Sequence, residues 1–176
     1  SEPLRRMGAA VTGVDPSQGM LDVLAGRDSR VKVVHGSATD LPFETDSFDL
    51  VFCVAVMHHV AEPAAVHKSL AEMVRVTSPV GHTVVWDHNP RNPYWKHLMA
   101  RVPQDIGEER LIPVAEMTEG LKAGGASSIA VEELGFVPDF TPVRLLGVMT
   151  GAERLVESTP LVKRLCAHNV VVAKKG

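Results

Sequence analysis

The chain has 176 residues, of which 45% are hydrophobic and 22% charged, and this is the length and composition of one globular domain. A net charge of -3 and a pI near 6.2 argue against a basic protein that binds nucleic acid. No apolar run approaches the roughly 18 residues of a membrane span and no signal peptide opens the chain, so we expect a cytoplasmic protein without a membrane partner.

The first predicted elements are a helix, a strand and a second helix. Residues Glu2–Met7 read as the end of a helix with Gly8 as its C-cap, and Val11–Val14 is a short strand that ends at Asp15. A helix over Met20–Ala25 follows the turn. A carboxylate at the carboxyl end of a parallel strand is placed to accept hydrogen bonds from the hydroxyls of a nucleotide ribose. The alternative is an aspartate that only caps the turn.

Strands and helices continue to alternate up to residue 88. We predict strands over Val31–His35, Phe48–Val54 and His82–Trp86, and a helix over Glu62–Val76. The helix places four apolar residues on one face: Val66, Leu70, Met73 and Val74. The run Phe48–Val54 is almost continuously apolar, as expected for a strand covered on both faces. This alternation is typical of right-handed βαβ units and a mostly parallel sheet with helices on both faces.

The regular alternation of strands and helices is interrupted in the second half of the chain. Residues 87–113 carry four prolines and the pair Tyr94-Trp95, with a helical piece predicted around Trp95–Val102. A helix over Ala115–Ala123 follows, and Ile129–Leu134 and Asn169–Ala173 are predicted as antiparallel closing strands at one sheet edge. No pattern fixes the structure of residues 136–160. We therefore expect a single domain, residues 1–176, with a cofactor-binding half (1–88) and an acceptor-shaping half (89–176).

Four stretches in this order and spacing resemble the class I S-adenosylmethionine-dependent methyltransferases, in their small-molecule (type 11) branch. They correspond to the family's second strand with its helix, its third-strand turn, its fourth strand with the following turn, and the helix that leads to strand five. The stretches are Val14-Asp15-Pro16-Ser17 with Met20-Leu21, Gly36–Phe43, Phe48–Val51 running to Met57-His58-His59-Val60, and Glu72–Val76 with Gly81. The resemblance implies a Rossmann-like α/β methyltransferase fold, S-adenosylmethionine as the cofactor and a small molecule as the acceptor.

The resemblance also implies roles for individual residues. Asp15, beside Pro16, would hold the ribose hydroxyls, and Met20 would lie against the face of the adenine. Ser37 and Ala38 would meet the edge of the adenine. The fourth strand would line the methionine half of the cofactor with residues that include Cys53 and Val54. His59, which follows that strand, would face the methyl-transfer site.

Three departures from the family pattern stand out. The family usually has an aspartate where this chain has Ser37, and nearby Asp40 is a possible substitute acceptor. The turn before strand five, Thr77–Gly81, keeps only the proline and one glycine of the usual Leu-Lys-Pro-Gly-Gly. The Gly-rich loop after the family's first strand has no counterpart here.

The family's first strand is central, between the strands that correspond to Val11–Val14 and Phe48–Val54. Without it, both neighbours have an open edge, and each buried amide without a partner costs about 1–3 kcal/mol. Against a total stability of about 5–15 kcal/mol, such losses are large. We expect the 176 residues to fold poorly by themselves, or the native protein to be longer at its amino end.

Two groups of residues are candidates for proton transfer, which a hydroxyl acceptor would need. His58 and His59 follow the fourth strand, and the alternative is that one begins a helix and the other packs structurally. Asp87 and His88 end the fifth strand, where Asp87 could orient His88; the alternative is an Asn-Pro turn capped by Asp87. Of these, we take His59, His88 and Asp87 as the catalytic candidates.

Tyr94, Trp95 and Cys53 each have a functional and a structural interpretation. Tyr94 and Trp95 suit either a lid over the substrate or the core. Cys53, like Cys166, reads as a buried thiol of a reducing compartment rather than a nucleophile. The eight histidines show no tight metal-ligand spacing, so we expect no metal.

Two alternative functions remain beside methyl transfer. A nicotinamide-dependent reductase would usually need a Tyr-x-x-x-Lys pair, but Tyr94 is followed at position 98 by Leu98. A non-catalytic remnant, which needs a partner or a missing amino-terminal segment to complete its sheet, also fits the pattern. The sequence leaves the acceptor molecule, the acceptor atom and the oligomeric state open.

Overall fold

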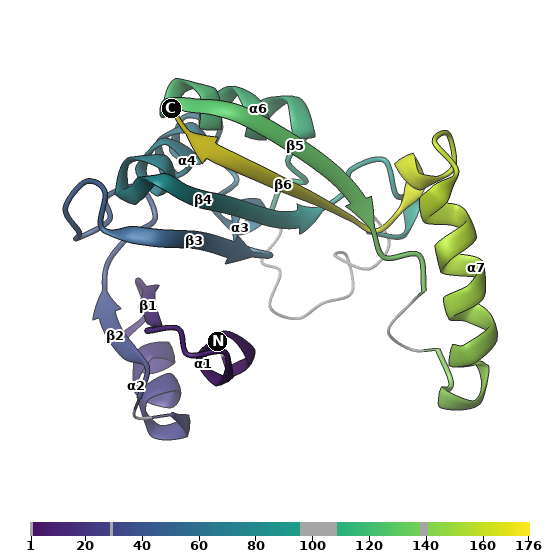
Figure 1. Cartoon of the computed structure of the whole chain (residues 1–176), viewed down its shortest axis with the longest axis horizontal. Coiled ribbons are helices and arrows are strands. Elements are labelled where there is room, and N and C mark those ends of the chain that lie inside the picture. Colours follow the sequence, from purple (N-terminus) through teal and green to yellow (C-terminus); the bar gives the residue numbers. More distant parts are fainter. Residues whose placement is uncertain (1, 29, 96–108, 138–140) are drawn as a thin grey trace.

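The computed structural model describes residues 2–28, 30–95, 109–137 and 141–176, and its strands form two separate sheets (Figure 1). The smaller sheet pairs β1 (Thr12–Asp15) with β2 (Lys32–His35) in parallel. The larger sheet has the order β3-β4-β6-β5. Its strands are β3 (Phe48–Val54), β4 (Thr77–His88), β6 (His168–Lys175) and β5 (Ala126–Leu134).

The smaller sheet belongs to a unit that begins with α1 (Glu2–Arg6) and includes α2 (Gln18–Arg27). Ser17 is the N-cap of α2 and its side chain accepts from the backbone N–H of Met20, which explains why the helix starts directly after the turn. Arg5 forms a 2.7 Å ion pair with Asp28, so α1 is joined to the far end of α2. The predicted helix–strand–helix–strand order is confirmed.

The larger sheet is mixed. Strands β3 and β4 are parallel, as the βαβ pattern predicted, whereas β6 runs antiparallel to both β4 and β5. The two closing strands are therefore antiparallel neighbours with β5 at the sheet edge, as expected. β4 is longer than predicted and ends at His88, opposite His168 at the start of β6.

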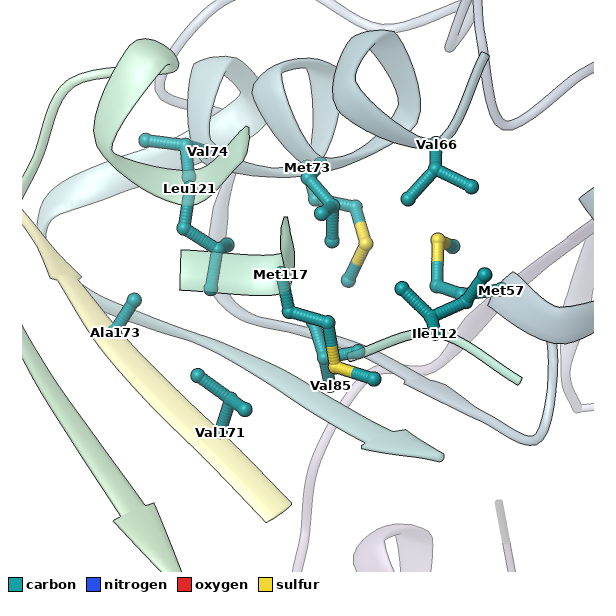
Figure 2. Packing of buried hydrophobic residues seen from close by; sticks show 11 residues of the cluster. Met57, Val66, Met73, Val74, Val85, Ile112, Met117, Leu121, Val171 and Ala173 are labelled. Atoms are coloured by element: carbon teal, nitrogen blue, oxygen red, sulfur yellow. The ribbon is translucent and has the colours of Figure 1, made fainter. Parts of the chain in front are cut away.

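The hydrophobic core lies between the larger sheet and two helices, α4 (Pro63–Val76) and α6 (Val114–Ala123) (Figure 2). The four apolar residues predicted for one face of α4 are all buried. Pro63 stands at the start of α4, where its missing N–H costs nothing, and Glu62 caps the helix by accepting from Ala65. The cluster consists of Met57, Val66, Leu70, Met73, Val74, Val85, Ile112, Met117, Leu121, Val171 and Ala173.

The two covering helices approach closely because α6 has a glycine on the contact face and another at its end. A β-carbon at Gly120 would lie 2.7 Å from Leu70 Cδ1, and one at Gly124 would lie 2.7 Å from Ala71 Cα. Any side chain at these positions would push α6 away from α4 and open the core between them.

Several elements have no counterpart in the predicted ones. These are α3 (Met57–Val60), the 3-10 turns η1 (Val143–Leu145) and η2 (Lys163–Leu165), and α7 (Leu146–Ser158). The helical piece expected around Trp95–Val102 lies, beyond Trp95, outside the described residues.

The strand edges that face one another across the two sheets are open. Within the described ranges, β1 pairs with β2 alone and β3 pairs with β4 alone. The face of β3 turned away from α4 exposes Leu50, Phe52 and Val54 by 42%, 41% and 54%. The expectation that β3 is covered on both faces is therefore not met by the described residues, while the expected interruption of the sheet between β1 and β3 is found.

Candidate active site

A cavity of about 460 Å³ lies between the smaller sheet and β3, and most of the predicted cofactor residues line it. Its walls include Asp15, Pro16, Ala38, Cys53 and Val54. The structure thus brings together residues that are up to 39 positions apart in the sequence. Two candidates are not part of its wall: Met20 is 59% exposed on α2, and Ser37 is exposed on the turn after β2.

The turn that carries Asp15 is held by hydrogen bonds of its own. Asp15 Oδ1 accepts from the backbone N–H of Ser17 at 2.8 Å, and a ring nitrogen of His35 lies 3.0 Å from the Pro16 carbonyl oxygen. Asp15 therefore does cap the turn. A carboxylate offers about four acceptor sites, so one backbone bond leaves room for a ribose hydroxyl as well.

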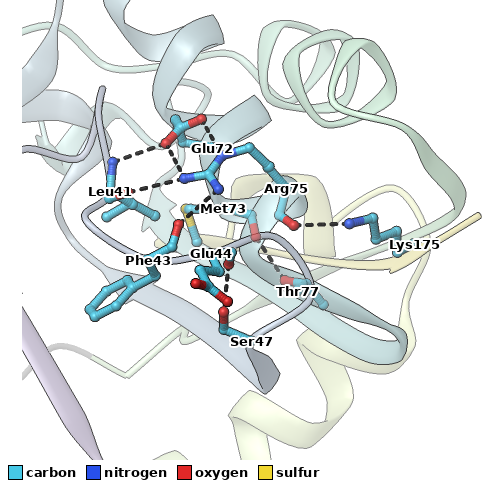
Figure 3. A network of polar contacts seen from close by, with 9 residues as sticks. All are labelled: Leu41, Phe43, Glu44, Ser47, Glu72, Met73, Arg75, Thr77 and Lys175. Atoms are coloured by element: carbon cyan, nitrogen blue, oxygen red, sulfur yellow. Dashed lines mark hydrogen bonds and ion pairs between the residues drawn. The ribbon is translucent and has the colours of Figure 1, made fainter.

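The next turn along the cavity, residues 36–43, is fastened to α4 by an arginine–glutamate pair (Figure 3). Arg75 donates to the carbonyl oxygens of Leu41 and Phe43 at 3.0 and 2.8 Å, and Glu72 accepts from the N–H of Leu41 at 2.9 Å. The hydrogen bond from Arg75 lowers the pKa of the Glu72 carboxyl, so the pair stays ionised at neutral pH. The clamp fixes the turn that bears Ser37 and Ala38.

Asp87, at the end of β4, is the most thoroughly bonded side chain of the site. Its carboxylate is fully buried and accepts from the backbone N–H groups of Met57, His58 and His88 and from His58 Nδ1, at 2.7–3.2 Å. Burial favours the neutral acid, but the hydrogen bonds from the His58 side chain and the His88 backbone outweigh burial and lower the pKa of Asp87. Asp87 thus orients His58, not His88 as expected.

His88 lies in a row of stacked rings instead. Its ring centroid is 4.4 Å from that of His58 and 3.6 Å from that of Trp95. Burial lowers the pKa of His88 to about 4. Trp95 is 8% exposed and its indole N–H donates to the Ala167 carbonyl oxygen, so Trp95 belongs to the core. Tyr94 beside it is 37% exposed.

His59 is the exposed member of the group. The centroid of its ring is 4.0 Å from that of the buried His58 ring, and its Nδ1 lies 3.9 Å from a carboxylate oxygen of Glu109. Met57, two residues earlier, lines the cavity and also donates to Asp87. The cofactor candidates and the catalytic candidates are therefore joined through α3.

A second arginine clamp holds α3 from the other side. Arg110 donates from its backbone to the His58 carbonyl oxygen at 3.1 Å and from Nε to the Ala61 carbonyl oxygen at 2.7 Å. Its guanidinium also binds Glu116 of α6 with two bonds of 2.8 and 2.6 Å. Sequence reasoning missed Glu109, Arg110 and both clamps, because each joins segments that are far apart or irregular.

The backbone on both sides of α3 is strained. Ala55 and Ala61 have φ values of 54° and 56°, in the left-handed region that L-residues avoid. The Ala55 N–H donates to the Trp86 carbonyl oxygen at 2.8 Å, and Ala61 is held by Arg110. These bonds hold the strained turn that presents His58 and His59.

The site offers neither a reactive thiol nor a metal cluster. Burial and the charge of Asp87 raise the pKa of the Cys53 thiol to about 12. Among the residues that the structure describes, no three His, Cys, Asp or Glu side chains gather where they could hold a metal ion. The same residues include no helix of the length and apolar character that a bilayer span requires.

The cavity suits a nucleoside-type cofactor in size and chemistry. Its volume falls in the range of small-molecule sites, and its wall is mostly apolar with the Asp15 carboxylate at one end. Gly36 adjoins it, where a β-carbon would lie 2.9 Å from Pro42 and 3.2 Å from Val14, so the turn can pass close to the cavity only without a side chain.

Comparisons with known proteins agree with this geometry. Residues 1–85 match a family model described as a methyltransferase domain. A demethylmenaquinone methyltransferase of Clavibacter sepedonicus is 46% identical over 89 residues, which cover 48% of this chain and 35% of that protein. A ubiquinone biosynthesis O-methyltransferase of Marinobacter nauticus is 30% identical over 140 residues, covering 71% and 58%. The matched stretches thus span between about a third and three fifths of these relatives.

Solved structures show the same architecture. A SAM-dependent methyltransferase from Archaeoglobus fulgidus superposes with a TM-score of 0.69 at 16% sequence identity, over 99% of this chain and 80% of the other. At that identity, the likeness establishes a common fold and does not extend to the substrate.

Proposed function

We infer that this chain is a class I S-adenosylmethionine-dependent methyltransferase, which binds S-adenosylmethionine beside β1 and directs its methyl group to a small-molecule acceptor. The observation that carries the proposal is that Asp15, Ala38 and Val54 line the same cavity, which Met57 connects to the histidines of α3. We place the reaction in the cytoplasm, without a nucleic-acid partner.

The cofactor half is assigned to the walls of the cavity. Asp15, next to Pro16, accepts from the ribose hydroxyls, and the turn held by the Arg75 clamp presents Ser37 and Ala38 to the adenine edge. Met20 would contact the adenine face from α2. Cys53 and Val54 bound the methionine half. When bound, the cofactor supplies an electrophilic methyl group on a sulfonium, and the protein contributes alignment and proton transfer.

We propose a reduced quinone as the acceptor, that is, an aromatic ring with ionisable hydroxyl groups. Both relatives reported above are named for quinones, demethylmenaquinone and ubiquinone. Methyl transfer to a phenolic oxygen, or to a ring carbon activated by a phenolate, needs the hydroxyl proton to be removed. The exposed ring of His59 is placed to take it.

The residues around His59 stabilise its protonated ring and hold that ring in position. Glu109, 3.9 Å away, stabilises the imidazolium that forms, while Asp87 and His58 are positioning residues that hold the ring stack beneath it. His88 stacks against His58 and so helps to hold the His58 ring in place. The acceptor loses a proton to His59 and gains the methyl group, and the proton then leaves to water, so the products are methylated acceptor, S-adenosylhomocysteine and a proton.

Isothermal titration with S-adenosylhomocysteine tests the cofactor half. Asp15→Asn removes a charged acceptor and is expected to weaken binding about 10- to 100-fold. Asp22→Asn is the matched control, because Asp22 is exposed on α2 and bonded to Gln18 away from the cavity. Equal affinities of the two variants would contradict the assignment of Asp15.

Turnover of a short-chain naphthoquinol tests the acceptor half. His59→Gln should lower kcat, with little change in the affinity for S-adenosylhomocysteine. An unchanged kcat would reject His59 as the base.

The second candidate is a non-catalytic chain whose sheet is completed by another polypeptide, and the open edges of β1 and β3 favour it. Failure of the unaltered chain to bind S-adenosylhomocysteine under conditions where it is folded would support this candidate.

A further inference from the structure

Helix α7 is amphipathic, but it turns its polar side toward the protein. Glu153 accepts from the backbone N–H groups of Phe136 and Val137 at 2.9 and 3.1 Å, and Glu157 accepts from that of Gly135 at 3.0 Å. The acidic stripe of the helix is therefore used to attach it to the chain after β5. None of its 13 residues is buried.

The opposite side of α7 and its flanking turns form an exposed apolar area, which we name the α7 surface. Val148 and Leu155 are 76% and 69% exposed, and lie seven residues apart on one face of the helix. Apolar side chains from η1 and the segment after α7 extend the area. Its most exposed members are Val143, Leu145, Val148, Leu155, Leu161 and Leu165.

The charges around the α7 surface are basic. Residues 141–165 contain four basic side chains and two acidic ones, in a chain whose net charge is -3. Both acidic side chains are the glutamates that bind backbone amides, whereas Arg144, Arg154 and Arg164 are exposed. Apolar side chains with a rim of arginines match the interface of a bilayer that contains anionic lipids. A second copy of the same surface would instead bring like charges together.

The α7 surface is attached to the edge of the sheet that carries the site. Asn89, two residues after Asp87, donates from Nδ2 to the carbonyl oxygens of Arg164 and Cys166 at 3.0 and 2.8 Å. Asn92 donates to that of Leu165 at 2.7 Å. Figure 1 shows α7 beyond the end at which the arrows of β3 and β4 terminate.

We propose that the α7 surface binds peripherally to anionic phospholipid bilayers, with the active-site edge of the sheet facing the lipid. The proposal rests on the proposed function for its purpose, since a quinol with an isoprenoid tail resides in the bilayer and must be taken up from it. It departs from our expectation of no membrane partner, which rested on the lack of a long apolar run.

Sedimentation with lipid vesicles tests the proposal without any methyl donor or acceptor. The chain is expected to sediment with vesicles of phosphatidylglycerol and phosphatidylcholine, but to remain in solution with phosphatidylcholine alone, and added salt should weaken binding. Val148→Asp and Leu155→Asp should each lower the partition coefficient about tenfold or more. Val80→Asp is the matched control, because Val80 is 86% exposed in β4 and remote from α7 in the chain.

The following results would overturn the proposal that the α7 surface binds a bilayer. Binding that survives Val148→Asp and Leu155→Asp, or that Val80→Asp reduces equally, would overturn the proposal, provided that circular dichroism shows folded variants. A shift from dimer to monomer in the Leu155→Asp variant, without vesicle binding by the unaltered chain, would assign the α7 surface to a second copy. Loss of vesicle binding leaves the titration with S-adenosylhomocysteine unaffected, so the two proposals fail separately.

Discussion

The residue with the widest influence on this site is Asp87, because one buried carboxylate joins β4 to α3. It accepts four hydrogen bonds, from α3 and from the residue that follows it in β4. An ionised carboxylate in an apolar interior is tolerated only when it is bonded in this way. Burial favours the neutral form of His88 as well, and lowers its pKa to about 4.

His88 makes the stability of the protein depend on pH. Its pKa is about 4 in the folded protein and near 6.5 when unfolded, so between these values the unfolded chain binds the additional proton. The free energy of unfolding should therefore fall as the pH falls from 6.5 to 4, by up to about 2–3 kcal/mol from this residue. His88→Phe keeps a ring against Trp95 and removes the titration.

Urea unfolding of the two proteins at several pH values checks this prediction. The difference in unfolding free energy between His88→Phe and the unaltered chain should increase steadily toward acid pH. His88 Nδ1 is buried without a hydrogen-bond partner in the described structure, so the variant leaves no amide or carboxylate unpaired. A difference that is constant across the range would refute the assigned pKa.

At the scale of elements, the close packing of α4 against α6 depends on two glycines, Gly120 and Gly124. The glycines of α6 allow the two helices to share the core cluster, and the Arg110–Glu116 pair ties the same helix to α3. The packing of α6 thus bears on both the core and the site. α7 is the contrasting element, since it is attached by its glutamates and buries no side chain.

Alanine substitutions at one glycine beside α6 and one in α7 should distinguish the tightly packed helix from the exposed one. Gly124→Ala places a methyl group 2.7 Å from Ala71 Cα and should destabilise the protein by about 1–3 kcal/mol. Gly147→Ala, in α7, meets nothing within 4 Å and should be neutral or stabilising by up to about 1 kcal/mol, because alanine favours the helix. Thermal unfolding of both variants measures the difference, and equal midpoints would show that the helices can separate without cost.

The sequence predicted the regular elements well and the contacts between them poorly. Periodicity located β3 and the buried face of α4, since both signals are local. α7 escaped notice because Gly147, Thr150 and Gly151 lower its helix propensity. Within the site, Asp87 was paired with its neighbour in sequence, but adjacent residues of a strand point to opposite faces, and His58 lies 29 residues away.

The candidate cofactor residues illustrate the same limit. Asp15 and Val54 line one cavity because the ends of neighbouring strand units meet there, which the βαβ pattern anticipates. The clamps formed by Arg75 and Arg110 depend on tertiary geometry that no local pattern encodes.

The whole molecule is divided at the gap between β1 and β3. On one side lie β4 and β6, paired on both edges and packed against the core. On the other side, the unit of β1, α2 and β2 contributes few buried side chains, among them Leu21 and Val31. Cooperativity depends on contacts that join such units, so the smaller one should open more readily.

Hydrogen exchange followed by mass spectrometry measures this difference. Amides of β4 and β6 should exchange slowest, and those of Thr12–Asp15 and Lys32–His35 at least about 100-fold faster, which corresponds to roughly 3 kcal/mol less protection. Addition of S-adenosylhomocysteine should slow exchange in the smaller unit most. Equal protection of both units would show that the gap is bridged in solution.

The open edge of β3 has a consequence for handling the protein. Native sheets usually guard an exposed edge with lysine, proline or a bulge. Strand β3 contains no lysine or proline, and its register irregularity lies at its start, between Phe48 and Leu50. Its unpaired amides and apolar side chains are a template for the same strand of another molecule. We therefore expect association through this edge to increase with protein concentration, and a ligand that fills the neighbouring cavity to reduce it.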